Sequence, residues 1–177
     1  EDVVTNPTDT PTEDPLRAQP SPHARATDRA RGASHARSGP PGVPSRRIVG
    51  IRVDGVTMQG AVDQIVRWSQ QEQSRYLSVA TIHLTMEAHD DPSFREIINN
   101  ADMVIPDGMP MVWALRWFGV RGQQRVGGPD LTPALCERAE AHGIPVGFYG
   151  VTDETMAQLL DVCRRRWPRL KVAYAYS

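Results

Sequence analysis

The stretch at residues 102–109, DMVIPDGM, decides the fold. Its apolar residues 103–105 form a short run that is typical of a strand buried on both faces. Residues 106–108, Pro-Asp-Gly, then end the strand in a turn. The segment Met111–Phe118 follows with helical character and enough large apolar side chains to be buried on much of its girth. A buried strand, a tight turn and a helix form the unit from which parallel sheets are built.

The same unit is repeated along residues 47–177. Strands are expected at Ile48–Val53, Tyr76–Thr81, Pro145–Tyr149 and Leu170–Tyr176. Helices are expected from the Thr57 cap, over Leu84–Ala88 and Pro92–Asn99, from Thr132-Pro133 to Gly143, and from Thr152 or Asp153 to Trp167. The sequence therefore predicts an α/β domain, a Rossmann-like parallel sheet flanked by helices. Its last strand runs into Ser177, so we expect the domain to be truncated there and to self-associate through an uncovered face.

Residues 1 to about 46 differ in composition, because they are rich in Pro, Thr, Ser, Ala and Arg and poor in large apolar side chains. Such a segment buries too little apolar surface to offset the roughly 1–2 kcal/mol per residue that backbone ordering costs. The sequence therefore predicts a disordered tail at 1–46 and a folded domain at 47–177. An alternative is an arginine-rich arm that contacts anionic lipid or nucleic acid, although acidic residues are interspersed in it.

The chain has 177 residues and a formal net charge of −1, which argues against a nucleic-acid partner for the domain. No apolar run approaches the roughly 20 residues of a membrane span, and residues 1–4 lack the features of a signal peptide. Cys136 and Cys163 fall among apolar neighbours in predicted helices, which favours two buried thiols over a disulfide or a zinc site. A cytoplasmic protein is expected.

Asp107 is the first candidate for function, because ligands of an open parallel sheet bind beyond the carboxyl ends of its strands. One interpretation is that its side chain caps the following helix. Pro110 would then be the third helical residue, whereas proline favours the first, so a cap at Met109 is expected instead. The Asp107 carboxylate would then be available as a general base near a helix N-terminus. From the residues alone, catalysis and capping both stay open.

Arg125 and the pair Gly127-Gly128 form a second candidate, in the segment RVGGPD at 125–130. A fixed guanidinium can bind a diphosphate through two nitrogens, and paired glycines let backbone N–H groups approach anionic oxygens. The alternative is a solvated loop arginine beside a flexible turn. The residues alone do not decide between an anion site and an ordinary loop.

Three other features receive structural interpretations. His83 and His89 lack the spacing of metal ligands, so surface or structural roles are expected. Trp113 and Trp117 stand at helical spacing and are expected in the core, in preference to a sugar-stacking platform. The turn at Gly150 matches no nucleotide-binding fingerprint.

Four segments, taken in order, resemble successive motifs of one family. They are Val53–Met58 (VDGVTM), Asp102–Met109 (DMVIPDGM), Arg125–Leu131 (RVGGPDL) and Pro145–Gly150 (PVGFYG). Together they are similar to the motifs of the WecG/TagA/CpsF glycosyltransferases, and the resemblance covers roughly residues 48–177. No single motif would be sufficient.

The resemblance implies transfer of a sugar, often of the N-acetylmannosamine type, from a UDP-sugar donor to a polyprenyl-diphosphate-linked sugar acceptor. It implies inversion at the anomeric centre without a metal or other cofactor. Asp107 would be the general base, and Arg125 would hold the donor or its diphosphate. The family also implies peripheral contact with the inner face of the plasma membrane through a basic C-terminal segment beyond Ser177. Further substrate-binding positions that the resemblance implies are Gly108, Gly127 and Gly128 in the matched motifs and Thr81, which replaces a pocket-lining asparagine of the family.

At the end of the second predicted strand the chain departs from the family. Many members carry Thr-Pro-Asn where this chain has Val79-Ala80-Thr81, so Thr81 replaces the asparagine and the first hydroxyl is lost. This departure bears on the donor sugar more than on the reaction class. The alternative function is a non-catalytic nucleotide- or sugar-binding domain, and a dehydrogenase is disfavoured because no strand ends in G-x-G-x-x-G.

Overall fold

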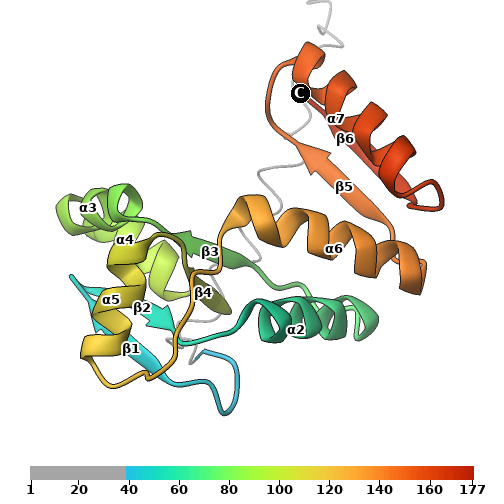
Figure 1. Ribbon diagram of the computed structural model, residues 1–177. Helices are drawn as coiled ribbons and strands as arrows, with labels where there is room; N and C mark the ends of the chain where they lie inside the picture. Colours follow the sequence, from blue (N-terminus) through green and yellow to red (C-terminus); the bar gives the residue numbers. More distant parts are fainter. Residues whose placement is uncertain (1–38) are drawn as a thin grey trace, which may run out of the picture. The chain divides into compact units, whose positions relative to one another are not determined.

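The computed structural model describes residues 39–177 (Figure 1). Residues 1–38, which make up most of the predicted tail, lie outside the described residues. The first strand begins at Ser45, two residues before the predicted start of the domain. None of the helices in residues 39–177 is long and apolar enough to cross a bilayer.

Strands and helices are interspersed along the chain, as the sequence predicts for an α/β domain. In chain order they are β1 (Ser45–Ile48), β2 (Ile51–Asp54), α2 (Met58–Gln70), β3 (Leu77–Ala80), α3 (Ile82–Asp90), α4 (Pro92–Asn99), β4 (Met103–Pro106), α5 (Met109–Trp117), α6 (Gly128–His142), β5 (Val146–Tyr149), α7 (Asp153–Arg166) and β6 (Val172–Tyr176). The predicted caps at Thr57, Asp91 and Thr152 each accept a backbone N–H of the first helical turn.

Within the described residues the strands form three two-stranded sheets, and not one continuous parallel sheet. The pairs β3–β4 and β5–β6 are parallel, as predicted, whereas β1 and β2 are antiparallel. The predicted strand Ile48–Val53 is therefore wrong, because the chain reverses at Val49 and Gly50, whose φ angles are +47° and +88°. Two successive positive φ angles are the signature of a tight hairpin turn.

A buried carboxylate joins β2 to β4. Asp54, at the end of β2, is fully buried, and its Oδ2 accepts the backbone N–H of Val104 at 2.8 Å. Its Oδ1 accepts from Ser45 Oγ at 2.7 Å and from Arg52 Nε at 3.1 Å. A side chain thus accepts a hydrogen bond that a neighbouring strand's carbonyl would accept in a continuous sheet. This explains why β2 contacts β4 without joining its sheet.

The strand β4 separates two hydrophobic clusters. Val104 packs in one of them with residues of α3, α4 and α5, whereas Met103 and Ile105 pack in the other with residues of α2 and α6. Alternate side chains of a strand point to opposite faces, so β4 is covered by helices on both (Figure 1). The prediction of a buried parallel strand flanked by helices is confirmed here.

Helix α6 begins earlier than the sequence predicts. The predicted cap and first residue, Thr132 and Pro133, lie inside it, because Gly127 is the N-cap and Gly128 the first helical residue. Pro129 then takes an early helical position, where a missing N–H removes no bond. The helix ends at Gly143 with φ of +65°, as predicted.

A third cluster lies between α6 and α7. It contains Cys136, Cys163 and Trp167, and both thiols are unoxidised and buried, as expected. The neighbouring strand β6 is exposed along all five residues, including Tyr174 and Tyr176. This fits the expectation that part of the last strand is uncovered.

Candidate functional site

The candidate residues lie at the carboxyl ends of β3 and β4. Ala80 and Pro106 are register partners, and the backbone N–H of Asp107 donates to the Ala80 carbonyl at 3.0 Å. Thr81 and Asp107 therefore leave two adjacent parallel strands at the same end. This is the edge at which ligands of parallel sheets bind.

Asp107 does not cap the helix that follows it. The N-cap of α5 is Gly108, one residue before the predicted Met109, and no side chain bonds to this end of the helix. Gly108 has φ of +106°, a conformation that side chains disfavour, which gives this glycine a backbone role. The capping interpretation is therefore wrong for α5, and the carboxylate is available for other contacts.

The Asp107 carboxylate lies instead at the N-terminus of α6. Its Oδ1 accepts from Arg125 Nη1 at 3.0 Å, and the backbone N–H of Gly128 approaches its Oδ2 at 3.4 Å. The side chain is 17% exposed. A guanidinium and the positive end of a helix thus surround one solvent-accessible carboxylate. Three residues that the sequence placed in two separate candidates form one cluster.

Arg125 bridges two carboxylates. Its Nη2 bonds to Oδ2 of Asp130, and its Nη1 holds Asp107. Asp130 lies in the first turn of α6, where the helix dipole favours a negative charge. Arg125 thus pairs with two carboxylates, while 41% of its side chain stays exposed. Asp130 belongs to this candidate cluster, and sequence reasoning missed it because the late predicted start of α6 left it in a loop.

Gly127 and Gly128 have different roles. A Cβ atom at Gly127 would lie 2.3 Å from Arg125 Nη1 and 2.9 Å from Asp107 Oδ1, so the ion pair occupies the space that a side chain would fill. A Cβ atom at Gly128 would meet no atom within 4 Å, and this residue contributes its N–H. The backbone N–H of Gly128 approaches the Asp107 carboxylate, and its binding of a diphosphate stays a prediction.

Thr81 is the N-cap of α3. Its Oγ1 accepts the backbone N–H of Leu84 at 3.1 Å. The hydroxyl proton can still be donated, because capping uses the oxygen as an acceptor. The structure places Thr81 at the same sheet end as Asp107, and its role in substrate binding stays a prediction.

The remaining candidates lie elsewhere. His83 and His89 are exposed, and His83 faces Glu87 one turn away. Within residues 39–177, no group of three His, Cys, Asp or Glu side chains could hold a metal ion. The expectation of a buried tryptophan pair is wrong, because Trp113 is 60% and Trp117 88% exposed.

An apolar cavity of about 200 Å³ lies between α2 and α6, away from the candidate residues. Its lining is aliphatic apart from Ser69, so it offers no charged side chain for acid–base chemistry or for binding a phosphate. The chemistry of the side chains therefore points to the Asp107–Arg125 cluster and not to this cavity. Residues that line the cavity include Ile65, Val66, Leu135, Ala139, Ile144 and Val146.

Residues 46–177 match the model of the glycosyl transferase WecG/TagA/CpsF family. The chain belongs to this family. It is also similar to an N-acetylglucosaminyldiphosphoundecaprenol N-acetyl-beta-D-mannosaminyltransferase of Bacillus spizizenii, with 26% identity over 103 residues. That similarity covers 58% of this chain and 40% of the relative, so the chain spans less than half of the length of this relative. The motifs quoted from the sequence thus identify the family correctly.

Proposed function

We propose that this chain carries the base and the diphosphate-binding arginine of a glycosyltransferase. The donor would be a UDP-sugar of the N-acetylmannosamine type, and the acceptor a polyprenyl-diphosphate-linked sugar. The observation that supports this most is the cluster of Asp107, Arg125 and the Gly128 N–H at the end of a buried strand. It unites a carboxylate that can take a proton with two donors that can hold an anion.

In the proposed reaction an acceptor hydroxyl oxygen attacks the anomeric carbon on the face opposite the UDP group. The new carbon–oxygen bond forms as the bond to the diphosphate oxygen breaks, and the electron pair leaves with UDP. The hydroxyl proton passes to the Asp107 carboxylate. Negative charge that grows on the leaving diphosphate is stabilised by Arg125 and by backbone N–H groups at the start of α6. Configuration at the anomeric carbon is inverted.

The ion pair between Asp107 and Arg125 links donor binding to the release of the base. Oδ1 of Asp107 is occupied by the guanidinium, so an acceptor hydroxyl cannot approach this oxygen directly. A diphosphate carries more charge than a carboxylate and can therefore compete for the Nη1 group that holds Asp107. We infer that the donor draws Arg125 away from Asp107 and exposes the base when the substrate arrives. Asp130 keeps the guanidinium at the start of α6 during this exchange.

The partners follow from the same proposal. The UDP-sugar binds at the ends of β3 and β4, where Thr81 and Gly108 form the rim of the site. The lipid-linked acceptor implies work at the inner face of the plasma membrane. Assembly into a homo-oligomer is compatible with this proposal. Measuring UDP binding and sugar transfer separately distinguishes a transferase from a domain that only binds nucleotide.

The test of the base is Asp107→Asn, which keeps the size of the side chain. We expect kcat to fall by at least about a hundredfold, because the proton acceptor is lost. UDP affinity should stay the same or rise, because Arg125 no longer has a competing carboxylate. UDP binding is measured by calorimetry on this chain, and transfer on the longest natural polypeptide that contains it. If the wild type binds UDP but neither this chain nor the longer polypeptide transfers a sugar, a non-catalytic binding domain is favoured. If Asp107→Asn transfers sugar at the wild-type rate, Asp107 is not the general base.

The role of Arg125 is tested through Gly127, whose lack of a side chain leaves room for the guanidinium. Gly127 has φ of −98° and ψ of 147°, which alanine adopts easily, so Gly127→Ala acts through its Cβ and not through the backbone. The Cβ displaces the guanidinium, and we expect UDP affinity to fall about tenfold, equivalent to about 1.4 kcal/mol. The control is Arg165→Ala, on the exposed side of α7, which should bind UDP as the wild type does. Equal effects of the two substitutions would contradict the role given to Arg125.

A further inference from the structure

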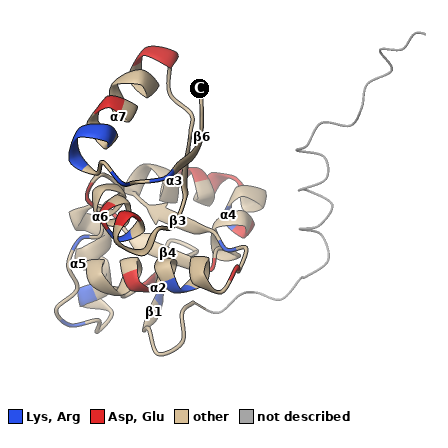
Figure 2. Ribbon diagram, turned by 90° about the vertical axis from the view of Figure 1, so that its right-hand side faces the viewer, with Lys and Arg blue, Asp and Glu red and all other residues tan. Residues whose placement is uncertain are grey.

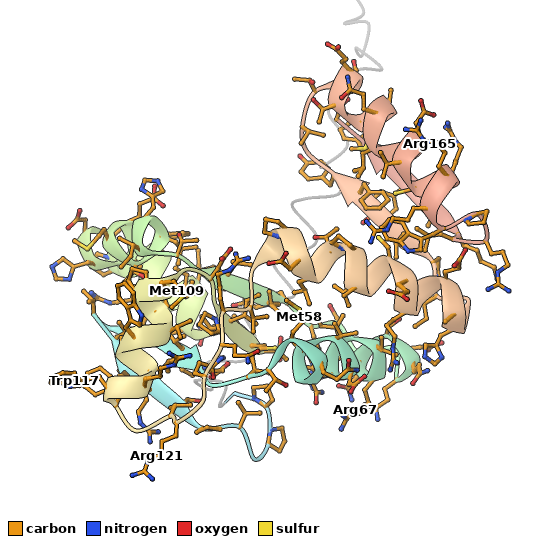
Figure 3. All side chains as sticks on the ribbon, in the orientation of Figure 1. Met58, Arg67, Met109, Trp117, Arg121 and Arg165 are labelled. Carbon is orange, nitrogen blue, oxygen red and sulfur yellow. The ribbon has the colours of Figure 1, made fainter. Side chains whose placement is uncertain are left out.

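Helix α5 exposes a line of large apolar side chains. Met109, Trp113 and Trp117 recur every four residues and therefore lie on one face of the helix. They are 42%, 60% and 88% exposed. Figure 3 shows Trp117 extending away from the ribbon at one end of α5 and Met109 at the other. We call these three residues the α5 stripe.

The exposure of the stripe is fixed by the opposite side of the helix. Met111, Val112 and Leu115 are at most 2% exposed. Met111 and Leu115 belong to the cluster that holds β2 and β4, so α5 cannot turn its tryptophans inward without emptying this core. Exposed tryptophans held on a rigid helix mark an interaction surface.

Positive charge lies beside the Trp117 end of the stripe. Arg116 lies on α5 and Arg121 in the following loop, and residues 108–129 contain no Asp or Glu. Arg46 of the neighbouring strand β1 donates from Nε to the carbonyl of Phe118 at 2.7 Å, and Phe118 is itself 49% exposed. In Figure 2 the ribbon of α5 and its following loop shows the blue of arginine and none of the red of acidic residues. Arg121 projects beside the end of α5 in Figure 3.

We propose that the α5 stripe, together with Arg116 and Arg121, docks on the surface of an anionic lipid bilayer. Tryptophan prefers the boundary between headgroups and acyl chains, because its ring is apolar and its N–H is polar. Arginines beside it bind lipid phosphates, and each basic residue near an anionic surface adds about 1 kcal/mol of attraction. The stripe supplies the apolar contact and the arginines supply the preference for anionic lipid.

A second copy of the chain fits this surface less well. In a two-fold dimer the same patch faces itself, so arginines of one copy would approach those of the other. No acidic residue of 108–129 is available to neutralise them. A bilayer with anionic headgroups brings the opposite charge and therefore fits both features of the surface.

This docking does not depend on the proposed transfer reaction, although it would assist that reaction. Met109 follows Gly108 directly, so the stripe starts two residues from Asp107. A bilayer that contacts α5 would bring the site close to lipid-linked molecules. Lipid binding and sugar transfer are measured separately, so one can fail without the other.

The experiment is co-sedimentation of the chain with vesicles of phosphatidylcholine containing about 30% phosphatidylglycerol, compared with pure phosphatidylcholine vesicles. We expect binding to the anionic vesicles and a blue shift of tryptophan emission, with quenching by brominated lipid. Residues 1–46 contain no tryptophan, so the emission reports the domain even if the arginine-rich tail also touches lipid. Unchanged emission on anionic vesicles would overturn the proposal.

Variants locate the contact. Trp117→Ser should weaken vesicle binding at least tenfold, and Arg121→Gln should reduce the preference for anionic lipid. Matched controls are Ile97→Ser, exposed on α4, and Arg165→Gln, exposed on α7, neither of which should change binding. Because both test positions are exposed, their melting temperatures should match the wild type. Equal loss of binding in test and control variants, or a dimer that Trp117→Ser dissociates without any effect on vesicle binding, would refute lipid docking.

Discussion

The strands β4 and β6 each pair in parallel with a neighbour, but they are opposite in burial. All four residues of β4 are buried, whereas all five residues of β6 are exposed. The candidate site stands at the end of the buried strand. The difference shows that parallel pairing alone does not make a strand part of a core, since the cover of helices on each face decides that.

The burial of β4 also explains why functional side chains gather at its end. A strand held between two hydrophobic clusters has little freedom, so the turn after it presents Asp107 in a fixed position. The pair β5–β6 has a smaller cluster between α6 and α7, and its aromatic side chains Tyr149 and Tyr176 stack on the surface with ring centroids 6.0 Å apart. The candidate site thus follows the more tightly packed of these two strands.

The largest expected effect is the loss of the buried carboxylate that joins β2 to β4. Asp54→Ala leaves the Val104 N–H without its carboxylate acceptor and the guanidinium of Arg52 without its buried counter-charge. We expect the free energy of unfolding to fall by about 3–5 kcal/mol. Urea denaturation followed by circular dichroism measures it.

The matched control for this substitution lies on α7. Asp161 also pairs with an arginine, Arg164, but both side chains are more than half exposed. Asp161→Ala should change stability by less than about 0.5 kcal/mol, because exposed ion pairs contribute little. If the two substitutions destabilise the chain equally, the contrast between a buried and an exposed region is wrong.

A smaller effect is expected from the same substitution made in both strands. Val104 on β4 is fully buried, and Val104→Ala should destabilise the chain by about 2 kcal/mol through lost burial and a residual cavity. Val172 on β6 is 38% exposed, and Val172→Ala should change stability by at most about 0.5 kcal/mol. A loss at Val172 as large as that at Val104 would mean that something covers β6 in solution.

Much of the local structure could be predicted, because local signals specify it. Three side-chain caps, the C-terminal Gly143 and the buried run of β4 depend on a few neighbouring residues. The joining of strands could not be predicted, since it depends on Asp54 reaching a backbone N–H fifty residues away. The β1–β2 hairpin was missed because Ile48–Val53 has the composition of one continuous strand, and only the backbone at Val49 and Gly50 shows the turn.

For the site, the sequence identified Asp107, Arg125 and the two glycines but not their contact. The ion pair arises because α6 starts at Gly128 and brings its N-terminus to the end of β4, which the later predicted start did not anticipate.

The exposure of Trp113 and Trp117 was missed for another reason. Periodicity places both on one face of α5, but it cannot say which face the core takes when both are apolar.

The smallest expected effect concerns pH and the contact between α6 and α7. Burial raises the pKa of the Cys136 and Cys163 thiols, and at Cys136 the neighbouring Cys163 raises it further. Unfolded thiols ionise near their ordinary pKa of about 8.5, whereas the folded ones keep their protons to higher pH. The folded chain then binds more protons than the unfolded chain, so stability is complete below about pH 8.5 and falls as pH rises through the raised pKa values.

The test compares the wild type with the double variant Cys136→Ala/Cys163→Ala in urea at pH 7.5 and 9.5. Between these pH values we expect the free energy of unfolding to fall more in the wild type than in the variant, by about 1 kcal/mol or less. The double variant loses some stability at both pH values through its cavities, so the comparison uses the change with pH and not the stability itself. Equal changes with pH in the two proteins would show that the α6–α7 cluster opens to solvent, and that the contrast with the β4 core is larger than the structure indicates.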